Sequence, residues 1–314
     1  MTVSYSTETS HKRILIVIPA FNEEESIGEV IQNAKAIYPE ILVYDDGSID
    51  NTSSIAESNG AIVIRNSRNR GYGRALRTLF EHARSMNFDV VVTIDSDGQH
   101  DPNQIPGLIQ PILDNKADMV IGSRFLTNDD EANVPRYRSF GIRTITKFTQ
   151  AGCFDRITDA TSGFRAYSVN SLSKLNLTEN GMAISTEILL KASEKNLRIF
   201  EVPITTKRYD IKDSSTHSPI KLGWSVISHV IRFLSFKHPL LFYGIPGLIF
   251  LIFSSWFLYG ALDLFSSTRY VSTNLIVISI GLALLGFVLL ATSAIVYTLV
   301  SLFKGHIKDQ RELG

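Results

Sequence analysis

The sequence contains one cysteine, Cys153, in 314 residues, and neither sign of charge is in excess. A single cysteine excludes an internal disulfide framework and a thiolate metal cluster, so we interpret Cys153 as a packing residue. The 31 basic and 31 acidic residues give a formal net charge of zero. No global charge therefore favours nucleic acid, and we expect no nucleic-acid partner.

Charge is absent from two long stretches near the C-terminus, residues 239–262 and 270–303. About 20 apolar residues are enough to cross a bilayer as a helix. We therefore predict a two-helix transmembrane hairpin over 239–303, with a loop around Asp263 to Asn274. The alternative is a buried helical hairpin in a soluble core, but polar positions at helical spacing are missing from both stretches.

Basic residues flank these stretches and are scarce between them. The flanking residues are Arg232, Lys237, Lys304, Lys308 and Arg311, and the connection contains only Arg269. Positive charge favours the cytoplasmic side of a membrane. We therefore expect a membrane protein with two spans, whose large N-terminal domain and both termini, including the tail 304–314, are cytoplasmic.

The segment 217–238 precedes the first span and combines apolar residues at helical spacing with basic ones. The apolar residues include Trp224, Ile227, Ile231 and Leu234, and the basic ones include Lys221 and Arg232. This pattern is typical of an amphipathic helix in the membrane interface. An amphipathic helix that packs on the soluble domain remains the alternative.

Residues 1–216 show the pattern of an α/β domain. Short β-branched runs predict strands over 13–19, 41–44, 61–65, 89–94 and 119–121, and helical spacing predicts helices over 24–37, 52–58, 73–86 and 105–113. Strands that alternate with helices indicate a mostly parallel sheet covered on both faces. Ligands of such sheets bind at the carboxyl ends of the strands.

Polar turns stand at three of these strand ends: P-A-F-N-E-E (19–24), D-D-G-S-I-D-N-T (45–52) and D-S-D-G-Q-H-D (95–101). Asp95 and Asp97 are two residues apart, and their like charges repel unless a cation lies between them. Mg²⁺ and Mn²⁺ prefer oxygen ligands of this kind. The turn therefore predicts a site for Mg²⁺ or Mn²⁺ next to an anionic ligand. The alternative role of an aspartate in this turn, capping the following helix, fits Asp101 better than Asp95 or Asp97.

The ordered set P-A-x-N-E, D-D-G-S-x-D-x-T, N-x-G-x-G-x-A, D-x-D-x-Q-H and D-x-x-S-G-F-R, within residues 12–210, resembles the inverting family 2 glycosyltransferases of the GT-A type. Within that family it looks most like dolichol-phosphate mannose synthases and other polyprenyl-phosphate glycosyltransferases, several of which carry a C-terminal pair of membrane helices. The resemblance implies a Rossmann-like GT-A domain with a mostly parallel sheet.

The resemblance also implies roles for individual residues. Asp97 and Gln99 hold the metal, and Asp95 holds the ribose or the water shell of the metal. Contacts to the nucleotide sugar fall on Pro19, Phe21, Glu23, Tyr44, Asp46, Asp95, Ser96, Asp97 and Arg208. Arg124 and Arg138 hold the acceptor phosphate and complete the catalytic set with Asp95 and Asp97. The basic residue of a mobile loop is Lys207 or Arg208.

Three positions leave the family pattern or stay open. Phe21 stands where many members have tyrosine, so a hydroxyl contact there is lost. Ile142 stands where a small polar residue often follows the second arginine. Arg165 either binds phosphate or pairs with Asp159 to hold its loop.

The implied reaction moves a hexose, first of all mannose from GDP-mannose, onto dolichyl or polyprenyl phosphate with inversion. A phosphate monoester with a second pKa of about 6 is already ionised at neutral pH and needs little help from a base. A hydroxyl acceptor would need a base, for which Asp159 is the candidate.

Other donors (UDP-glucose or UDP-N-acetylglucosamine) and a lipid or glycan hydroxyl acceptor are alternatives within the family. A sugar-1-phosphate nucleotidyltransferase is an alternative of another class. We also expect Gly281 and Gly286 in the second span to offer contacts between copies of the chain.

Overall fold

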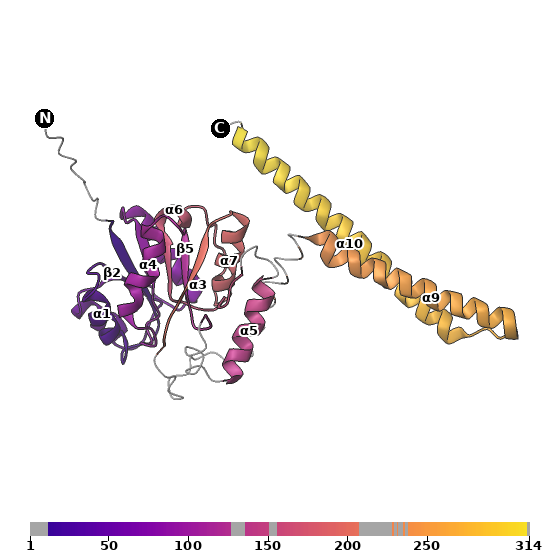
Figure 1. Cartoon of the computed structure of the whole chain (residues 1–314), viewed down its shortest axis with the longest axis horizontal. Coiled ribbons are helices and arrows are strands. Elements are labelled where there is room, and N and C mark those ends of the chain that lie inside the picture. Colours follow the sequence, from indigo (N-terminus) through magenta and orange to yellow (C-terminus); the bar gives the residue numbers. More distant parts are fainter. Residues whose placement is uncertain are drawn as a thin grey trace. The chain divides into compact units, whose positions relative to one another are not determined.

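The computed structural model describes residues 12–126, 136–150, 156–206, 228, 231, 235 and 238–312. The chain divides into two compact units, Met1–Val230 and Ile231–Gly314, which Figure 1 draws together and which are described one at a time below. The segment 217–238, expected to form an interfacial helix, lies almost wholly outside the described residues, as do Lys207 and Arg208.

The first unit is built on one seven-stranded sheet in the order β3-β2-β1-β4-β6-β5-β7. The strands are β1 Ile14–Ala20, β2 Ile41–Asp45, β3 Ile62–Arg65, β4 Val90–Thr93, β5 Met119–Ser123, β6 Arg165–Ser168 and β7 Ile199–Pro203. Strand β6 pairs antiparallel with both β4 and β5, and the other pairs are parallel. The mostly parallel sheet expected from the sequence is thereby confirmed.

The helices of this unit are α1 Ile27–Lys35, α2 Thr52–Ser58, α3 Tyr72–Ser85, the short 3₁₀ helix η1 Pro102–Gln104, α4 Ile105–Leu113, α5 Arg136–Gln150, α6 Val169–Leu172 and α7 Ile184–Glu194. All five strands and four helices predicted up to residue 121 are present, with ends within three residues. The elements after that point, including β6 and β7, were not predicted.

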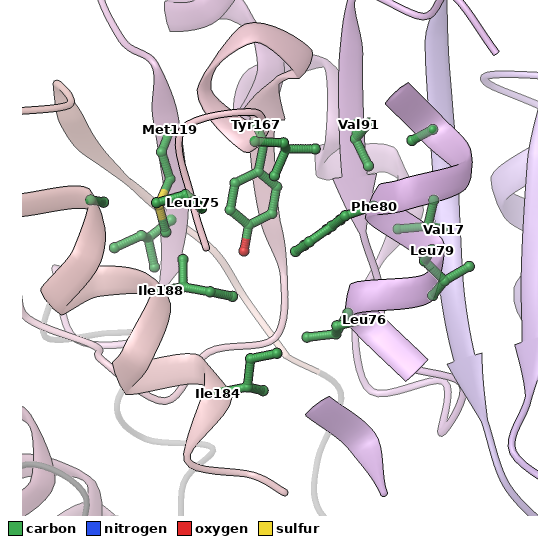
Figure 2. Close-up of a cluster of buried hydrophobic side chains, with 14 of the residues drawn as sticks. Val17, Leu76, Leu79, Phe80, Val91, Met119, Tyr167, Leu175, Ile184 and Ile188 are labelled. Carbon is green, nitrogen blue, oxygen red and sulfur yellow. The ribbon is translucent and has the colours of Figure 1, made fainter. Parts of the chain in front are cut away.

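Alternate residues of the central strand β1 supply two separate cores. Leu15 and Val17 join a cluster with side chains of α3 and α7, whereas Ile16 and Ile18 join a cluster with side chains of α1 and α4. Figure 2 shows the first cluster, where the rings of Phe80 and Tyr167 meet edge to face at 5.1 Å. Both faces of β1 are therefore buried, which explains its unbroken apolar run.

Strand register brings the predicted polar turns to one edge of the sheet. Ala20 at the end of β1 lies opposite Asp45 at the end of β2. Because β6 runs antiparallel, it begins at this same edge, with Arg165 opposite Thr93 of β4. The S-G-F-R segment thus enters the sheet beside the D-S-D-G-Q-H turn, a contact between residues about 70 positions apart.

The second unit is a helical hairpin of the π-helical segment η4 Leu240–Gly244, α9 Ile245–Thr268 and α10 Thr273–Glu312. The stretches Leu240–Thr268 and Thr273–Val300 are long and apolar enough to span a membrane. Only 17% and 11% of their most apolar windows are buried. Such exposed apolar helices do not fit the alternative of a buried hairpin in a soluble core.

The predicted loop around Asp263 to Asn274 is wrong, because α9 continues through Asp263 to Thr268 and the turn is only residues 269–272. The hydroxyls of Ser266 and Ser267 donate to the Asp263 carbonyl oxygen, as expected inside a helix. The helix ends where Arg269 adopts a left-handed φ of 57°. The exposed charge of Asp263 therefore did not mark the end of the first apolar helix.

Small residues form the seam between α9 and α10. Ser254 and Ser279 each donate a hydrogen bond of 2.9 Å to the other's carbonyl oxygen. A Cβ atom added to Gly286 would lie 2.9 Å from the carbonyl oxygen of Gly247, whereas one added to Gly281 would meet nothing within 4 Å. Gly286 therefore packs inside the hairpin, and of the two glycines expected to contact other copies only Gly281 has open space beside it.

The seam predicts different effects of the same substitution at these two glycines. Gly286→Leu should loosen the hairpin, because the atom it meets at 2.9 Å belongs to the backbone of Gly247 and cannot rotate away. Gly281→Leu is the matched control. We expect SDS titration of the detergent-solubilised chain to give a clearly lower unfolding midpoint for Gly286→Leu alone. Equal midpoints for the two variants would contradict this packing.

Candidate active site

The turns after β1 and β2 are joined by side-chain hydrogen bonds. The Asn22 N–H donates to Ser48 Oγ at 2.8 Å, and the Glu23 N–H donates to Thr52 Oγ1 at 2.8 Å. These bonds hold Glu23 and the half-buried Phe21 beside the D-D-G-S turn. Two of the expected nucleotide-sugar residues therefore lie together at the edge of the sheet.

Asp46, expected to contact the nucleobase, braces a neighbouring loop in the structure. Its carboxylate accepts hydrogen bonds from the N–H groups of Arg70 (2.9 Å) and Gly71 (2.7 Å). Tyr44 is only 5% exposed within the apolar core, and Pro19 is buried in β1. Burial leaves little surface of these three residues for a ligand. Their contacts with the nucleotide remain predictions.

Asp95 and Asp97 follow β4 at the same edge, with the buried Ser96 between them. The Tyr72 hydroxyl donates to Asp95 Oδ1 at 3.1 Å, and the Gln99 N–H donates to Asp97 Oδ1 at 3.0 Å. Burial raises the pKa of both carboxyls, and the charge of Asp95 raises the pKa of Asp97 further. The pair is thus short of positive charge.

The residues of this turn fit a divalent cation that arrives with an anionic ligand. A cation between Asp95 and Asp97 would relieve their repulsion, and the Gln99 side chain supplies a further oxygen of the right kind. No group of three or more His, Cys, Asp or Glu side chains suited to a metal occurs among the described residues. The protein donors are therefore few, and a diphosphate would have to supply the others.

His100 forms a wall of the site. Its ring stacks on Phe164 with centroids 5.1 Å apart, and its Nδ1 lies 3.7 Å from Asp95 Oδ2 without a hydrogen-bond partner among the described residues. Burial lowers the pKa of His100 to about 4. The imidazole is therefore neutral at pH 7 and a weak base. Asp101, as expected, caps η1 by accepting from the Asn103 N–H at 3.0 Å.

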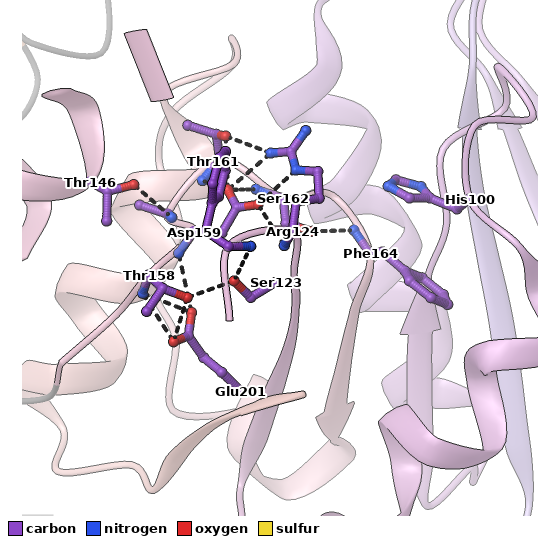
Figure 3. A network of polar contacts seen from close by, with 12 residues as sticks. His100, Ser123, Arg124, Thr146, Thr158, Asp159, Thr161, Ser162, Phe164 and Glu201 are labelled. Carbon is purple, nitrogen blue, oxygen red and sulfur yellow. Dashed lines mark hydrogen bonds and ion pairs between the residues drawn. The ribbon is translucent and has the colours of Figure 1, made fainter. Parts of the chain in front are cut away.

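Arg124, at the end of β5, forms a buried two-pronged ion pair with Asp159 (Figure 3). Its Nε lies 2.7 Å from Asp159 Oδ2, and its terminal nitrogen lies 2.9 Å from Oδ1. The pairing of Asp159 with Arg165 that the sequence left open is wrong. Arg165 instead donates to the carbonyl oxygens of Ala160 and Ser185 at 2.8 and 3.0 Å.

This ion pair makes Asp159 a poor general base. Burial alone would raise its pKa, but the charge and hydrogen bonds of Arg124, together with the Thr161 hydroxyl, outweigh burial and hold the pKa below its ordinary value. Its Oδ1 also accepts from the N–H groups of Thr161 and Ser162, both at 3.2 Å. The carboxylate is ionised and its lone pairs are engaged, so it has little capacity to take a proton from an acceptor hydroxyl.

Glu201 and Gly163 are site residues whose roles the sequence did not predict. The Glu201 carboxylate in β7 accepts from the N–H groups of Thr158 and Asp159 and so holds the loop that carries Asp159 (Figure 3). A Cβ atom on Gly163 would lie 2.5 Å from Asp95 Oδ2. The sequence shows Gly163 as part of the S-G-F-R motif, but it does not show that this glycine lies against Asp95.

Two expected site residues cannot be placed. Arg138 lies on α5, where its side chain is not described, and Arg208 lies outside the described residues. Arg124 belongs to the same edge of the sheet as Asp95, and its charge lowers the pKa of that carboxyl against the effect of burial. Contacts of Arg124, Arg138 and Arg208 with phosphate remain predictions.

Sequence comparison identifies the family. Residues 15–175 match the model of the family described as Glycosyl transferase family 2. The chain belongs to this family. It is therefore a glycosyltransferase, which removes the nucleotidyltransferase alternative. An uncharacterised protein of Methanocaldococcus jannaschii is 39% identical over 209 residues, covering 65% of this chain and 85% of that protein.

Two named relatives act on dolichyl phosphate by their descriptions. A UDP-N-acetylglucosamine–dolichyl-phosphate N-acetylglucosaminyltransferase of Methanococcus voltae is 34% identical, covering 62% of this chain and 86% of the relative. A dolichol-phosphate mannosyltransferase of Pyrococcus furiosus is 33% identical, covering 62% of this chain and 56% of the relative. The resemblance to polyprenyl-phosphate glycosyltransferases is thus confirmed.

The fold also matches solved structures. Glucosyl-3-phosphoglycerate synthase from Mycobacterium tuberculosis, solved with Mn²⁺, UDP and glucosyl-3-phosphoglycerate, superposes with a TM-score of 0.56 at 22% identity. The match covers 72% of this chain and 80% of the synthase. At this identity the likeness concerns the fold, and it confirms the GT-A architecture expected for the first unit.

The buried ion pair predicts a large stability effect. Asp159→Asn leaves the Arg124 charge uncompensated and should lower the free energy of unfolding of the first unit by about 3–5 kcal/mol. Asp118→Asn is the matched control, because Asp118 makes a similar two-pronged pair with Arg198 (both 3.0 Å) at the surface. We expect a cost of at most about 1 kcal/mol there.

The measurement is urea unfolding of the solubilised chain followed by circular dichroism. A lowered folded-state pKa means that Asp159 stabilises the fold above the ordinary aspartate pKa and loses this effect as the pH falls through the folded value. The difference between native protein and Asp159→Asn should therefore narrow below about pH 4. Equal costs for the two variants at pH 7 would contradict the analysis.

Proposed function

We propose that the protein transfers a hexose from a nucleotide sugar to dolichyl or polyprenyl phosphate, with inversion at the anomeric carbon. The observation that carries this proposal is the Asp95–Asp97 pair, two half-buried carboxyls with raised pKa at the end of β4. The dolichyl-phosphate relatives and the apolar hairpin support a lipid phosphate as the acceptor.

The chemistry is a displacement in which an acceptor phosphate oxygen attacks the anomeric carbon and the nucleoside diphosphate leaves from the opposite face. Asp97 and Gln99, with Asp95 beside them, would hold Mg²⁺ or Mn²⁺, which neutralises charge on the departing diphosphate. An ionised phosphate needs no base. The engaged Asp159 and the neutral His100, with a pKa of about 4, agree with a site that lacks one.

Positive charge for the acceptor phosphate comes in this proposal from Arg124 and Arg138. Arg124 is committed to Asp159 through two short hydrogen bonds, so it contributes mainly through its field. Arg138 is the proposed direct ligand, since guanidinium groups bind phosphate through paired hydrogen bonds. Arg208 is proposed to contact the nucleotide sugar instead. Phe21 and Glu23 are proposed to border the nucleotide.

Two donors are candidates. GDP-mannose is the first choice from the motif resemblance. UDP-N-acetylglucosamine is the second, because the 34% identical relative from Methanococcus voltae is named for that donor. We further propose two membrane spans with the catalytic unit and both termini in the cytoplasm, on the basis of the basic residues that flank the hairpin.

The test is a donor panel of GDP-mannose, UDP-glucose and UDP-N-acetylglucosamine with a short-chain polyprenyl phosphate and Mg²⁺ or Mn²⁺. We expect one donor to give a charged glycolipid, and Asp97→Ala to lower its rate of formation at least about 100-fold, because metal stabilisation of the leaving group is worth several kcal/mol.

Asp101→Ala is the control from the same turn, since Asp101 caps η1. It should cost about 1 kcal/mol of stability and little activity. Transfer from none of the three donors, or an Asp97→Ala variant as active as Asp101→Ala, would contradict the proposal.

A further inference from the structure

We infer that Tyr72 is a positioning residue, whose hydroxyl fixes the direction of the Asp95 carboxylate for the metal–nucleotide complex. The inference deepens the proposed function and rests on it in one respect, that Asp95 faces the donor. Tyr72 stands at one of the x positions of the N-x-G-x-G-x-A motif, and the sequence did not predict a role for it.

The first support is the contact itself. Tyr72 begins α3, and its hydroxyl donates to Asp95 Oδ1 at 3.1 Å while its ring packs on the apolar core. Burial raises the pKa of Tyr72 well above its ordinary value, and the Asp95 charge raises it further. The hydroxyl therefore keeps its proton and acts as a donor. A hydrogen bond to a charged group is among the stronger ones in proteins.

The second support is that the backbone around Tyr72 is held from both sides. The Gly71 N–H donates to Asp46 Oδ2, and the Gly73 N–H donates to the Asn180 carbonyl oxygen, each at 2.7 Å. Gly71 has a φ of 97°, which other residues rarely adopt, and a Cβ atom on Gly73 would lie 2.5 Å from the carbonyl oxygen of Glu179. The fold itself therefore sets the place of the Tyr72 hydroxyl.

The third support is the opposite wall of Asp95. A Cβ atom on Gly163 would lie 2.5 Å from Asp95 Oδ2, so the carboxylate occupies the space that this glycine leaves open. His100 Nδ1 stands 3.7 Å from the same oxygen, too far for a hydrogen bond. Among the described residues, Tyr72 thus donates the side-chain hydrogen bond that orients Asp95.

This arrangement links two subsites. Asp46 holds the loop, the loop holds Tyr72, and Tyr72 holds Asp95, so the end of β2 determines how the turn after β4 presents its carboxylate. Without the Tyr72 hydroxyl, the Asp95 carboxylate is free to rotate away from its position beside Gly163. Metal and nucleotide should then bind more weakly, whereas the rate at saturating metal should change less.

The experiment compares Tyr72→Phe with Tyr38→Phe in the full-length, detergent-solubilised chain. Tyr38 is a half-buried tyrosine beside the other core cluster. Calorimetric titration with Mn²⁺ and GDP or UDP should show about tenfold weaker binding for Tyr72→Phe and native affinity for Tyr38→Phe, with similar melting temperatures. Native affinity in Tyr72→Phe would overturn the inference, and so would a lowered melting temperature with unchanged affinity.

Two further variants test the route through Asp95. Gly163→Ala should weaken Mn²⁺–nucleotide binding in the same direction, because it displaces the carboxylate from the other side. In an Asp95→Ala background Tyr72→Phe should have no added effect, as expected for residues that act through one group. Additive losses would show that Tyr72 acts by another route and would overturn the inference.

The binding assay separates this inference from the proposed function. A native chain that binds Mn²⁺ and nucleotide but transfers no sugar to polyprenyl phosphate would remove the proposed acceptor, and the Tyr72 comparison would still decide the inference. A native chain that binds neither nucleotide would overturn both.

Discussion

Burying a carboxylate costs free energy unless hydrogen bonds compensate it, and in the first unit backbone N–H groups of neighbouring loops supply much of this compensation. Asp46, Asp159, Glu187 and Glu201 each accept hydrogen bonds from two or more backbone N–H groups of neighbouring loops. These acids hold loops in place. Among the described residues, Asp95 accepts from the Tyr72 hydroxyl and Asp97 accepts from the Gln99 N–H within its own turn, and burial leaves both with a raised pKa. Carboxylates thus hold neighbouring loops in four places, whereas we propose that the pair at the end of β4 holds a cation.

The antiparallel strand β6 brings a further loop to this edge of the sheet. In a fully parallel sheet, the segment next to β4 would have left the sheet at that edge instead of entering it. Because β6 runs the other way, the loop from Thr158 to Gly163 arrives at the carboxyl end of β4 and lies against Asp95. The Arg124–Asp159 pair and Glu201 then hold this loop from β5 and β7. The turn after β4 and the loop before β6 therefore meet at a single carboxylate, that of Asp95.

Periodicity predicted the elements whose signals are local. The apolar run of β1 and the helical spacing of α3 depend on burial of nearby residues, so both were found within about one residue. The partner of Asp159 was not predictable in this way, because Arg124 and Arg165 both stand at this edge and only the tertiary position of β6 decides between them. The role of Tyr72 is hidden for the same reason, since its partner lies 23 residues away after another strand.

Polar groups of a hairpin that spans a membrane must find their hydrogen-bond partners within the protein, because hydrocarbon offers none. The reciprocal bonds of Ser254 and Ser279 satisfy both hydroxyls within the seam, and Gly247 and Gly286 let the backbones approach closely. Packing within the hairpin therefore involves its own small residues, and many of its outer apolar side chains are exposed. Under the proposed function, in which the acceptor is a lipid phosphate, a membrane anchor would keep the enzyme and its acceptor at one surface and so raise their effective concentration.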